Sequence, residues 1–299
     1  MSIFEVDIMA KPHGQVVKVS GRNMHIRTMG AGEKTIVLLP GWGVPLPSVE
    51  FAPLMRALSK KYTVCLIEFF GYGHSDSTDR PHTNENYVQE IRTALSLAGL
   101  RPPYLLMPYS CAGIYCEYYA AKHPDEVEAL IMLDCTSSAE DMEALSKEEL
   151  EEIRQLHHQA LDTVENEDYT DADVEEYYAE YLKYGYTTEE LDEIITVPNH
   201  METLIGQLVA LSQNVQEVMA LDFPAKIPVL SLCSEVGVGC EGDEIEESRK
   251  DLAQAHKLHM DKLGGRGKLV VIEGSNHSDI CYRSEVICKE IDKFLGCIK

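Results

Sequence analysis

Short apolar runs recur along the chain and alternate with longer stretches of helical periodicity. Two runs near the start, 15–20 and 23–28, alternate polar and apolar residues on either side of Gly21, which predicts an antiparallel hairpin at a sheet edge. Six further runs are more continuously apolar, as in strands buried on both faces: 35–39, 62–67, 104–107, 129–134, 227–233 and 268–273. Helices are predicted between most of them, among others at 48–60, 84–97, 243–263 and 284–295. This alternation predicts an α/β protein with one mostly parallel, eight-stranded sheet and helices on both faces.

The alternation is interrupted between residues 138 and 224. This segment contains no convincing strand and at least three helical stretches. Two residue pairs in it have the spacing of helix-starting capping boxes or close variants: Ser146 with Glu149, and Thr170 with Asp173. The sequence therefore predicts a core domain formed by residues 1–137 and 225–299, with residues 138–224 inserted as an all-helical unit.

The charge of the chain disfavours two classes of partner. Its 299 residues contain 50 Asp and Glu against 26 Lys and Arg, a formal net charge of −24. Nucleic acids and anionic membranes would repel such a chain, so neither is an expected partner. The excess is concentrated in the insert, where 20 acidic residues stand against three basic ones between Glu140 and Glu193. The sequence does not indicate an oligomeric state.

The cellular location is predicted from the cysteines and the apolar runs. Nine cysteines are scattered along the chain, mostly in apolar segments, which is typical of reduced thiols in a cytoplasmic protein. No run approaches the length of a membrane span, and the charged first 14 residues do not have the pattern of a signal peptide or an anchor. No CxxC pair suggests zinc, and we expect neither a metal nor a cofactor.

The strand at 104–107 leads into a candidate nucleophile. It runs through Pro108 to Ser110 and then directly into an apolar helix, and a serine at such a strand-to-helix turn is typical of an activated nucleophile. The turn must be sharp, and the small residues Ala112 and Gly113 fit that demand; the common form of the turn has glycine where Pro108 stands. The alternative is that Ser110 only caps the helix that follows.

Three local patterns together resemble the α/β-hydrolase superfamily of lipases, esterases and haloalkane dehalogenases. Leu38–Gly43 resembles its loop after the third strand, Gly71–Asp76 its GxGxSD turn, and Pro108–Gly113 its nucleophile elbow. They occur in the family order, and the resemblance covers nearly the whole chain. It implies the α/β-hydrolase fold, with the helical insert as a cap between the sixth and seventh strands, and a Ser-His-Asp triad.

The resemblance implies that His277 is the base that activates Ser110. It follows the last predicted strand and precedes the last helix, where this superfamily carries its base. His74 lies in the GxGxSD-like turn, and four other histidines fall on predicted helices: His157, His158, His256 and His259. A metal pair formed by the last two lacks a third recognisable ligand.

Two residues are candidates for the acid of the triad. Many members of the superfamily carry this acid after the seventh strand. When the strand at 227–233 is aligned with the family pattern, Gly237 stands at that position, and glycine has no carboxylate. Glu235, two residues earlier, could serve if the loop is remodelled. Asp134, at the end of the sixth strand, occupies the place that another branch of the superfamily uses, and it is the preferred acid here. An aspartate at a strand end also often only caps the following turn.

The resemblance also implies an oxyanion hole formed by two backbone N–H groups, those of Trp42 and Cys111. The Cys111 amide begins the helix after the nucleophile and gains from the helix dipole. We expect its thiol to point away from the site.

These features predict a serine hydrolase, esterase or lipase-like or an amidase, that acts through an acyl-enzyme on a small to medium, neutral and apolar carbonyl substrate. Apolar and tyrosine side chains crowd two helices of the insert; such stripes are more often core than pocket. They are Tyr177, Tyr178, Tyr181, Tyr184 and Tyr186 on one helix, and Met201, Leu204, Leu208 and Leu211 on the other. The alternatives are a lyase or peroxidase with the same fold, and a ligand-binding protein with a vestigial triad.

Overall fold

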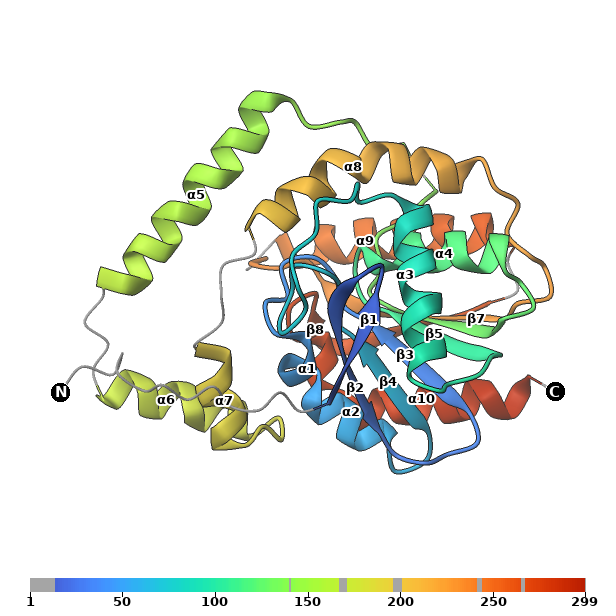
Figure 1. The fold of residues 1–299 in the computed structure, drawn as a ribbon, viewed down its shortest axis with the longest axis horizontal. Helices are drawn as coiled ribbons and strands as arrows, with labels where there is room; N and C mark the ends of the chain where they lie inside the picture. Colours follow the sequence, from blue (N-terminus) through green and yellow to red (C-terminus); the bar gives the residue numbers. More distant parts are fainter. Residues whose placement is uncertain are drawn as a thin grey trace.

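The computed structural model describes residues 14–139, 141–166, 171–195, 201–240, 244–264 and 267–298. Its eight strands form one sheet in the order β1-β2-β4-β3-β5-β6-β7-β8 (Figure 1). The strands are β1 (Gln15–Val19), β2 (Arg22–Met29), β3 (Thr35–Leu39), β4 (Thr63–Ile67), β5 (Tyr104–Pro108), β6 (Val127–Leu133), β7 (Val229–Val236) and β8 (Gly267–Asn276). Only β1 with β2 and β2 with β4 pair antiparallel; the other neighbours are parallel. The predicted fold class is therefore confirmed.

Helices cover both faces of this sheet (Figure 1). One apolar layer contains side chains of α3 (Asn84–Leu97), α4 (Ala112–Lys122) and α9 (Glu244–Lys262). The opposite layer contains those of α2 (Ala52–Leu58), α10 (Ser284–Cys297) and the short 3-10 helix η1 (Ile280–Tyr282). In β5, Leu106 lies in the first layer and Leu105 in the second, as the two-residue alternation of a strand requires.

One helix boundary differs from the prediction. The stretch 48–60, expected as a single helix, forms α1 (Pro47–Glu50) and α2, which are separated by Phe51. Pro53 lies in the first turn of α2, where its missing N–H costs nothing; inside one continuous helix, it would remove a hydrogen bond and crowd the preceding turn. The proline therefore favours two short helices.

Between β6 and β7, the described residues form four helices: α5 (Lys147–Asn166), α6 (Asp171–Leu182), α7 (Thr188–Ile195) and α8 (Met201–Met219). The described residues of 138–224 contain no strand. The Ser146 and Glu149 side chains cap each other's backbone N–H at the start of α5, as predicted; Thr170 lies outside the described residues. Figure 1 shows α5, α6 and α7 at one end of the molecule, while α8 runs back over the layer of α4.

The helix α7 is attached to the core by charged side chains. Glu190 contacts Arg56 at 2.5 Å and Arg27 at 3.8 Å, and its own side chain is buried. Glu193 lies 3.1 Å from the His74 ring. These contacts connect the insert to the second strand, to α2 and to the loop after β4.

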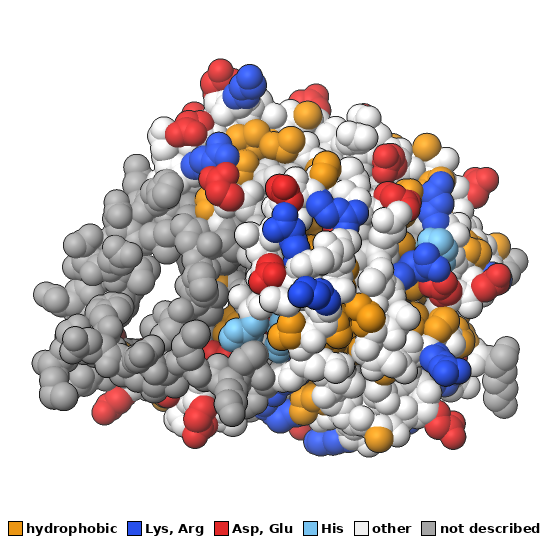
Figure 2. All heavy atoms as spheres, in the orientation of Figure 1, with side chains coloured by type: hydrophobic (Ala, Val, Ile, Leu, Met, Phe, Trp, Pro, Cys, Tyr) orange, Lys and Arg blue, Asp and Glu red, His pale blue; other side chains and the backbone are white. Residues whose placement is uncertain are grey.

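On the face of the molecule drawn in Figure 2, the charged side chains of the described residues do not separate by sign. Figure 2 shows basic and acidic side chains interspersed on the described part of this face, which does not resemble the continuous basic patch of a nucleic-acid-binding surface.

Among the described residues, no helix has both the length and the apolar character needed to cross a bilayer.

Candidate active site

Ser110 lies at the sharp turn between β5 and α4. Its φ of 56° is in the left-handed region, which residues other than glycine normally avoid. Its N–H donates to the carbonyl of Leu133 in the neighbouring strand β6, at 3.2 Å. A Cβ at Gly41 would come within 2.6 Å of the Ser110 Cβ, so the loop after β3 can pass the serine only with glycine there. The backbone is thus bent to lift the Ser110 hydroxyl out of the sheet.

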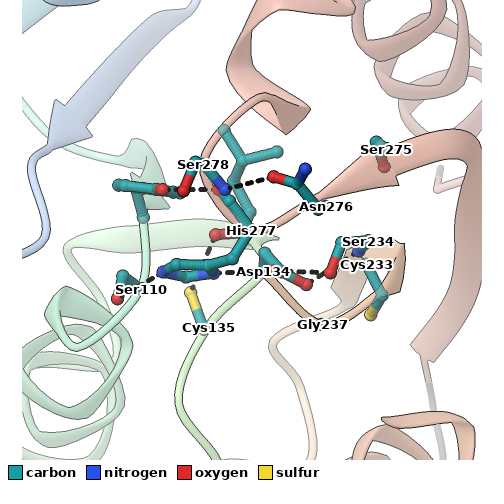
Figure 3. A network of polar contacts seen from close by, with 12 residues as sticks. Ser110, Asp134, Cys135, Cys233, Ser234, Gly237, Ser275, Asn276, His277 and Ser278 are labelled. Carbon is teal, nitrogen blue, oxygen red and sulfur yellow. Dashed lines mark hydrogen bonds and ion pairs between the residues drawn. The ribbon is translucent and has the colours of Figure 1, made fainter. Parts of the chain in front are cut away.

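His277 lies next to this hydroxyl (Figure 3). Its Nε2 is 3.0 Å from Ser110 Oγ. The ring stacks on Tyr109, with centroids 5.0 Å apart and planes 16° from parallel, and the Tyr109 hydroxyl donates to the His277 carbonyl at 2.6 Å. The imidazole is therefore fixed in place by the residue that precedes the nucleophile, while 39% of its side chain remains exposed to solvent.

Asp134 follows β6 and contacts the other nitrogen of this imidazole: its Oδ2 is 2.6 Å from His277 Nδ1. The N–H and the hydroxyl of Ser234 also donate to the carboxylate, at 2.7 and 2.9 Å. Burial alone would raise the pKa of Asp134, but the contacts with His256 and His277 and the Ser234 N–H outweigh it, so the pKa lies well below its ordinary value. The buried carboxylate is ionised at neutral pH.

Glu235, the alternative acid, lies in another environment. Its carboxylate accepts a hydrogen bond from the Gly274 N–H and one from Arg249, each at 2.8 Å. Gly237, at the position where many family members carry the acid, donates its N–H to Ser248 Oγ at 2.8 Å. The structure thus brings Asp134 to the histidine and occupies Glu235 in a loop contact.

The two backbone amides expected to bind an oxyanion belong to Trp42 and Cys111. Trp42 follows Gly41 in the loop after β3, and Cys111 is the N-cap residue of α4. Among the described residues, neither N–H has a hydrogen-bond acceptor outside its own residue. The indole of Trp42 donates to the Tyr115 hydroxyl at 3.1 Å, which holds this loop against α4. Neither amide is thus engaged by a backbone acceptor in the described part of the chain.

The expected direction of the Cys111 thiol is wrong. Its Sγ lies 3.9 Å from Ser110 Oγ and 3.3 Å from Thr136 Oγ1, beside the nucleophile. Cys111 is the N-cap residue of α4 and directly follows the nucleophile, and from this position its side chain lies beside Ser110. Burial raises the pKa of this thiol, so it stays protonated and is a weak nucleophile.

Three contacts of the site were not predicted. Tyr109 orients the histidine, Ser234 orients the aspartate, and His256 from α9 places its Nε2 3.5 Å from Asp134 Oδ1. Tyr109 and Ser234 are neighbours of residues already under consideration, and that adjacency was the available signal. Nothing in the sequence near His256 indicates that it faces the end of β6.

A small pocket of about 60 Å³ adjoins Tyr109 and Ser278. It is lined by aromatic and aliphatic side chains with one carboxyl group, that of Glu50; Tyr186 from the insert is among them. Tyr177, Tyr181 and Tyr184 pack near it through ring contacts with one another and with Tyr186 and Tyr282. Part of the predicted tyrosine stripe therefore borders this pocket.

Part of this chain matches the sequence model of a known protein family. Residues 34–168 match the family model described as alpha/beta hydrolase fold. An uncharacterized protein of Bacillus subtilis (strain 168), YbdG, is 28% identical over 229 residues, 75% of this chain and 69% of that protein. The serine hydrolase BPHL of Mus musculus is 30% identical over 119 residues, 39% of this chain and 40% of the relative.

A solved structure, the enol-lactonase from Burkholderia xenovorans LB400, superposes with a TM-score of 0.65 over 94% of this chain and all of the other, at 18% identity. At this identity the likeness concerns the fold alone.

Proposed function

Because this chain belongs to the α/β-hydrolase superfamily, we propose that it is a serine hydrolase, esterase or lipase-like or an amidase, that acts through an acyl-enzyme. The observation that carries the proposal is the line of contacts from Ser110 through His277 to Asp134, with 3.0 and 2.6 Å between the paired atoms. A nucleophile, a base and an orienting acid at hydrogen-bond distance are what acyl transfer by serine requires.

In this reaction, His277 Nε2 takes the hydroxyl proton as Ser110 Oγ attacks the carbonyl carbon of the substrate. Asp134 holds the imidazole by Nδ1–H and stabilises its positive charge. The carbonyl oxygen becomes negative and accepts hydrogen bonds from the Trp42 and Cys111 amides. The imidazolium then protonates the leaving group, and a water molecule activated by His277 hydrolyses the acyl-enzyme.

We infer a small to medium, neutral and apolar carbonyl substrate. The aromatic lining of the pocket beside Tyr109 favours an apolar group. The net charge of −24 disfavours anionic substrates by repulsion. Residues 138–224 would act as a cap, since Tyr186 of this segment lines the pocket. A cytoplasmic location is part of the proposal and is supported by the nine cysteines, all free.

The test is intact-protein mass after exposure to a fluorophosphonate probe. We expect one adduct on the wild type and none on Ser110→Ala or His277→Gln, because the probe reacts only with an activated serine. Ser96→Ala, at an exposed serine of α3, is the matched control and should label like the wild type. With a neutral ester substrate, Ser110→Ala or His277→Gln should lower kcat by about 10⁵–10⁶-fold.

An unlabelled wild type with a native melting transition would contradict the proposal. Ligand binding that survives Ser110→Ala would then favour a binding protein with a vestigial triad.

A further inference from the structure

A second group of reactive side chains lies behind the acid of the proposed triad. Asp134 at the end of β6, Cys233 in β7 and His256 in α9 each offer one potential ligand atom, and these atoms lie within 4.8 Å of one another. All three residues are buried. The three come from separate elements that the parallel sheet and the helix covering it bring together.

The position of His256 is unusual for a buried histidine. Its side chain is only 10% exposed, and Nε2 has no hydrogen-bond partner among the described residues. Buried ring nitrogens are normally hydrogen-bonded. The Asp134 Oδ1 atom is 3.5 Å from it, beyond the usual range for an N–H···O bond. The histidine therefore contacts the carboxylate only at the long limit of hydrogen-bond distance.

The same separation fits two ligands of one metal ion. Nitrogen and oxygen ligands lie about 2.0–2.2 Å from a tetrahedral zinc ion, which puts them about 3.3–3.5 Å from each other. In the described part of the chain, Asp134 Oδ1 accepts a hydrogen bond from the Ser234 N–H and retains a lone pair on the side of His256. The Cys233 side chain would have to rotate inward to close the site.

The ligand set and the surroundings favour a metal of the zinc class. A thiolate, an imidazole and a carboxylate suit zinc or cobalt, whereas magnesium and calcium prefer oxygen ligands alone. One thiolate and one carboxylate also balance the charge of a divalent ion, which a buried site requires. A cavity of about 210 Å³ reaches His256 and Ser234; its lining includes Glu235 and Glu273 against one cation, Arg249. The cavity thus reaches one of the three proposed ligands, His256, from the acidic side.

We propose that Asp134, Cys233 and His256 form a binding site for Zn²⁺ whose occupation inhibits the enzyme. Cys233 binds as the thiolate and releases its proton to solvent as the sulfur–zinc bond forms. The ion takes charge from the Asp134 carboxylate and lies close to His277. It therefore opposes the positive charge that His277 must accept when Ser110 attacks. Binding is independent of the proposed function, but the inhibition rests on it.

The experiment measures metal binding and hydrolysis on the same full-length protein. Zn²⁺ stoichiometry is read by native mass spectrometry. Co²⁺ is used as a spectroscopic probe, because a thiolate ligand gives a charge-transfer band that histidine and carboxylate ligands do not give. We expect one bound ion, a Co²⁺–thiolate band, and at least a tenfold loss of ester hydrolysis or of fluorophosphonate labelling, reversed by a chelator.

Cys233→Ser and His256→Gln should each weaken Zn²⁺ binding by about 100-fold or more, since loss of even an outer-shell partner costs about 10–100-fold. Each variant is compared with its own metal-free activity, and that ratio should change little at a Zn²⁺ concentration that inhibits the wild type. Cys65→Ser, at a fully buried cysteine of β4, and His123→Gln are matched controls that should bind and be inhibited like the wild type. Melting curves identify any variant that fails to fold, and Cys233→Ala then replaces Cys233→Ser.

The outcomes separate the two proposals. Zn²⁺ binding that persists in both ligand variants, or a Co²⁺ complex without the thiolate band, would overturn the site while hydrolysis upholds the serine hydrolase. A protein that binds Zn²⁺ through Cys233 and His256 but neither labels nor hydrolyses without metal would uphold the site and overturn the proposed function. Binding through these residues without any loss of hydrolysis would overturn the inhibition.

Discussion

Ser110 and Asp134 hold backbone conformations that side chains normally avoid, with φ angles of 56° and 46°. Such conformations cost about 1–3 kcal/mol each and persist where the surrounding structure fixes them. Here the neighbouring strands do so: the Ser110 N–H donates to Leu133 and the Asp134 N–H to Leu232, at 3.2 and 2.7 Å. The strain directs both side chains toward His277.

The space beside the nucleophile gives the first residue-scale prediction. Gly41→Ala would place a methyl group within 2.6 Å of the Ser110 Cβ and displace the hydroxyl from His277. A shift of about 1 Å costs about 100-fold in rate, so we expect a loss of that size in fluorophosphonate labelling and ester hydrolysis. Gly296→Ala, where a Cβ meets nothing within 4 Å, is the control. Wild-type labelling of a folded Gly41→Ala protein would contradict this account of the elbow.

The choice between Asp134 and Glu235 as the acid gives the second residue-scale prediction. Asp134→Asn should lower kcat by about 10⁴-fold, because an amide neither fixes the imidazole tautomer nor stabilises its charge. Asparagine tolerates the left-handed backbone at this position, so the fold should be retained. Glu235→Gln should stay within a few-fold of the wild type, since Glu235 is occupied by Gly274 and Arg249. Kinetics that rank the two variants the other way would make Glu235 the acid.

At the scale of the elements, α7 is attached to the core by the side chain of Glu190. The helix begins with a reciprocal cap between Thr187 and Glu190, and the same Glu190 carboxylate reaches Arg56. One side chain thus starts the helix and fixes it to α2. Tyr186, just before the helix, donates to the Glu50 carbonyl and lines the small pocket. The place of α7 therefore shapes the pocket.

We expect Glu190→Gln to loosen this helix. Removing the charge leaves Arg56 and Arg27 without their buried partner; fully buried pairs cost about 3–5 kcal/mol when broken. Because a third of the Arg56 side chain is exposed, the expected loss in the free energy of unfolding is nearer 2 kcal/mol. Urea unfolding measures the loss, and limited proteolysis should cut more readily within 138–224. The exposed neighbour Glu189 provides the control, Glu189→Gln, which should unfold like the wild type.

At the scale of the whole molecule, the carboxyl group of Glu50 makes one contribution to how stability varies with pH. Burial raises the pKa of Glu50 to about 7, from 4.5 in the unfolded chain. Between these values the folded protein binds more protons than the unfolded chain, so the Glu50 contribution to stability falls as the pH rises. Above about pH 7 the carboxylate is ionised and the loss is complete.

Glu50→Gln should remove this loss. The amide oxygen can still accept the Leu46 N–H, and the side chain no longer titrates. Relative to the wild type, the variant should gain stability between pH 5 and pH 8, by up to about 3 kcal/mol for a shift of this size. Urea unfolding at both pH values measures the gain. A difference that does not change with pH would show that Glu50 titrates near its ordinary value in the folded protein.

The sequence by itself determined the fold class and the position of each strand. The burial of each element determines the pattern of apolar residues in its own sequence. This pattern is a two-residue alternation at the sheet edge, continuous apolar runs in the centre, and helical spacing between them. Each of the eight predicted runs forms a strand. The turn at Ser110 was visible for the same reason, because the small residues of a sharp bend are neighbours in the chain. His277 was assigned by its place after the last strand.

Only the tertiary structure decided which distant side chains meet. Asp134 follows β6 and Glu235 lies near the end of β7, but register and loop path bring only Asp134 to the imidazole, 143 residues away in the chain. The direction of the Cys111 thiol and the meeting of Cys233 with His256 depended on the same geometry. Local periodicity records which face of an element is buried; it carries no information about the neighbour on that face. The order of strands in the sheet supplies that neighbour.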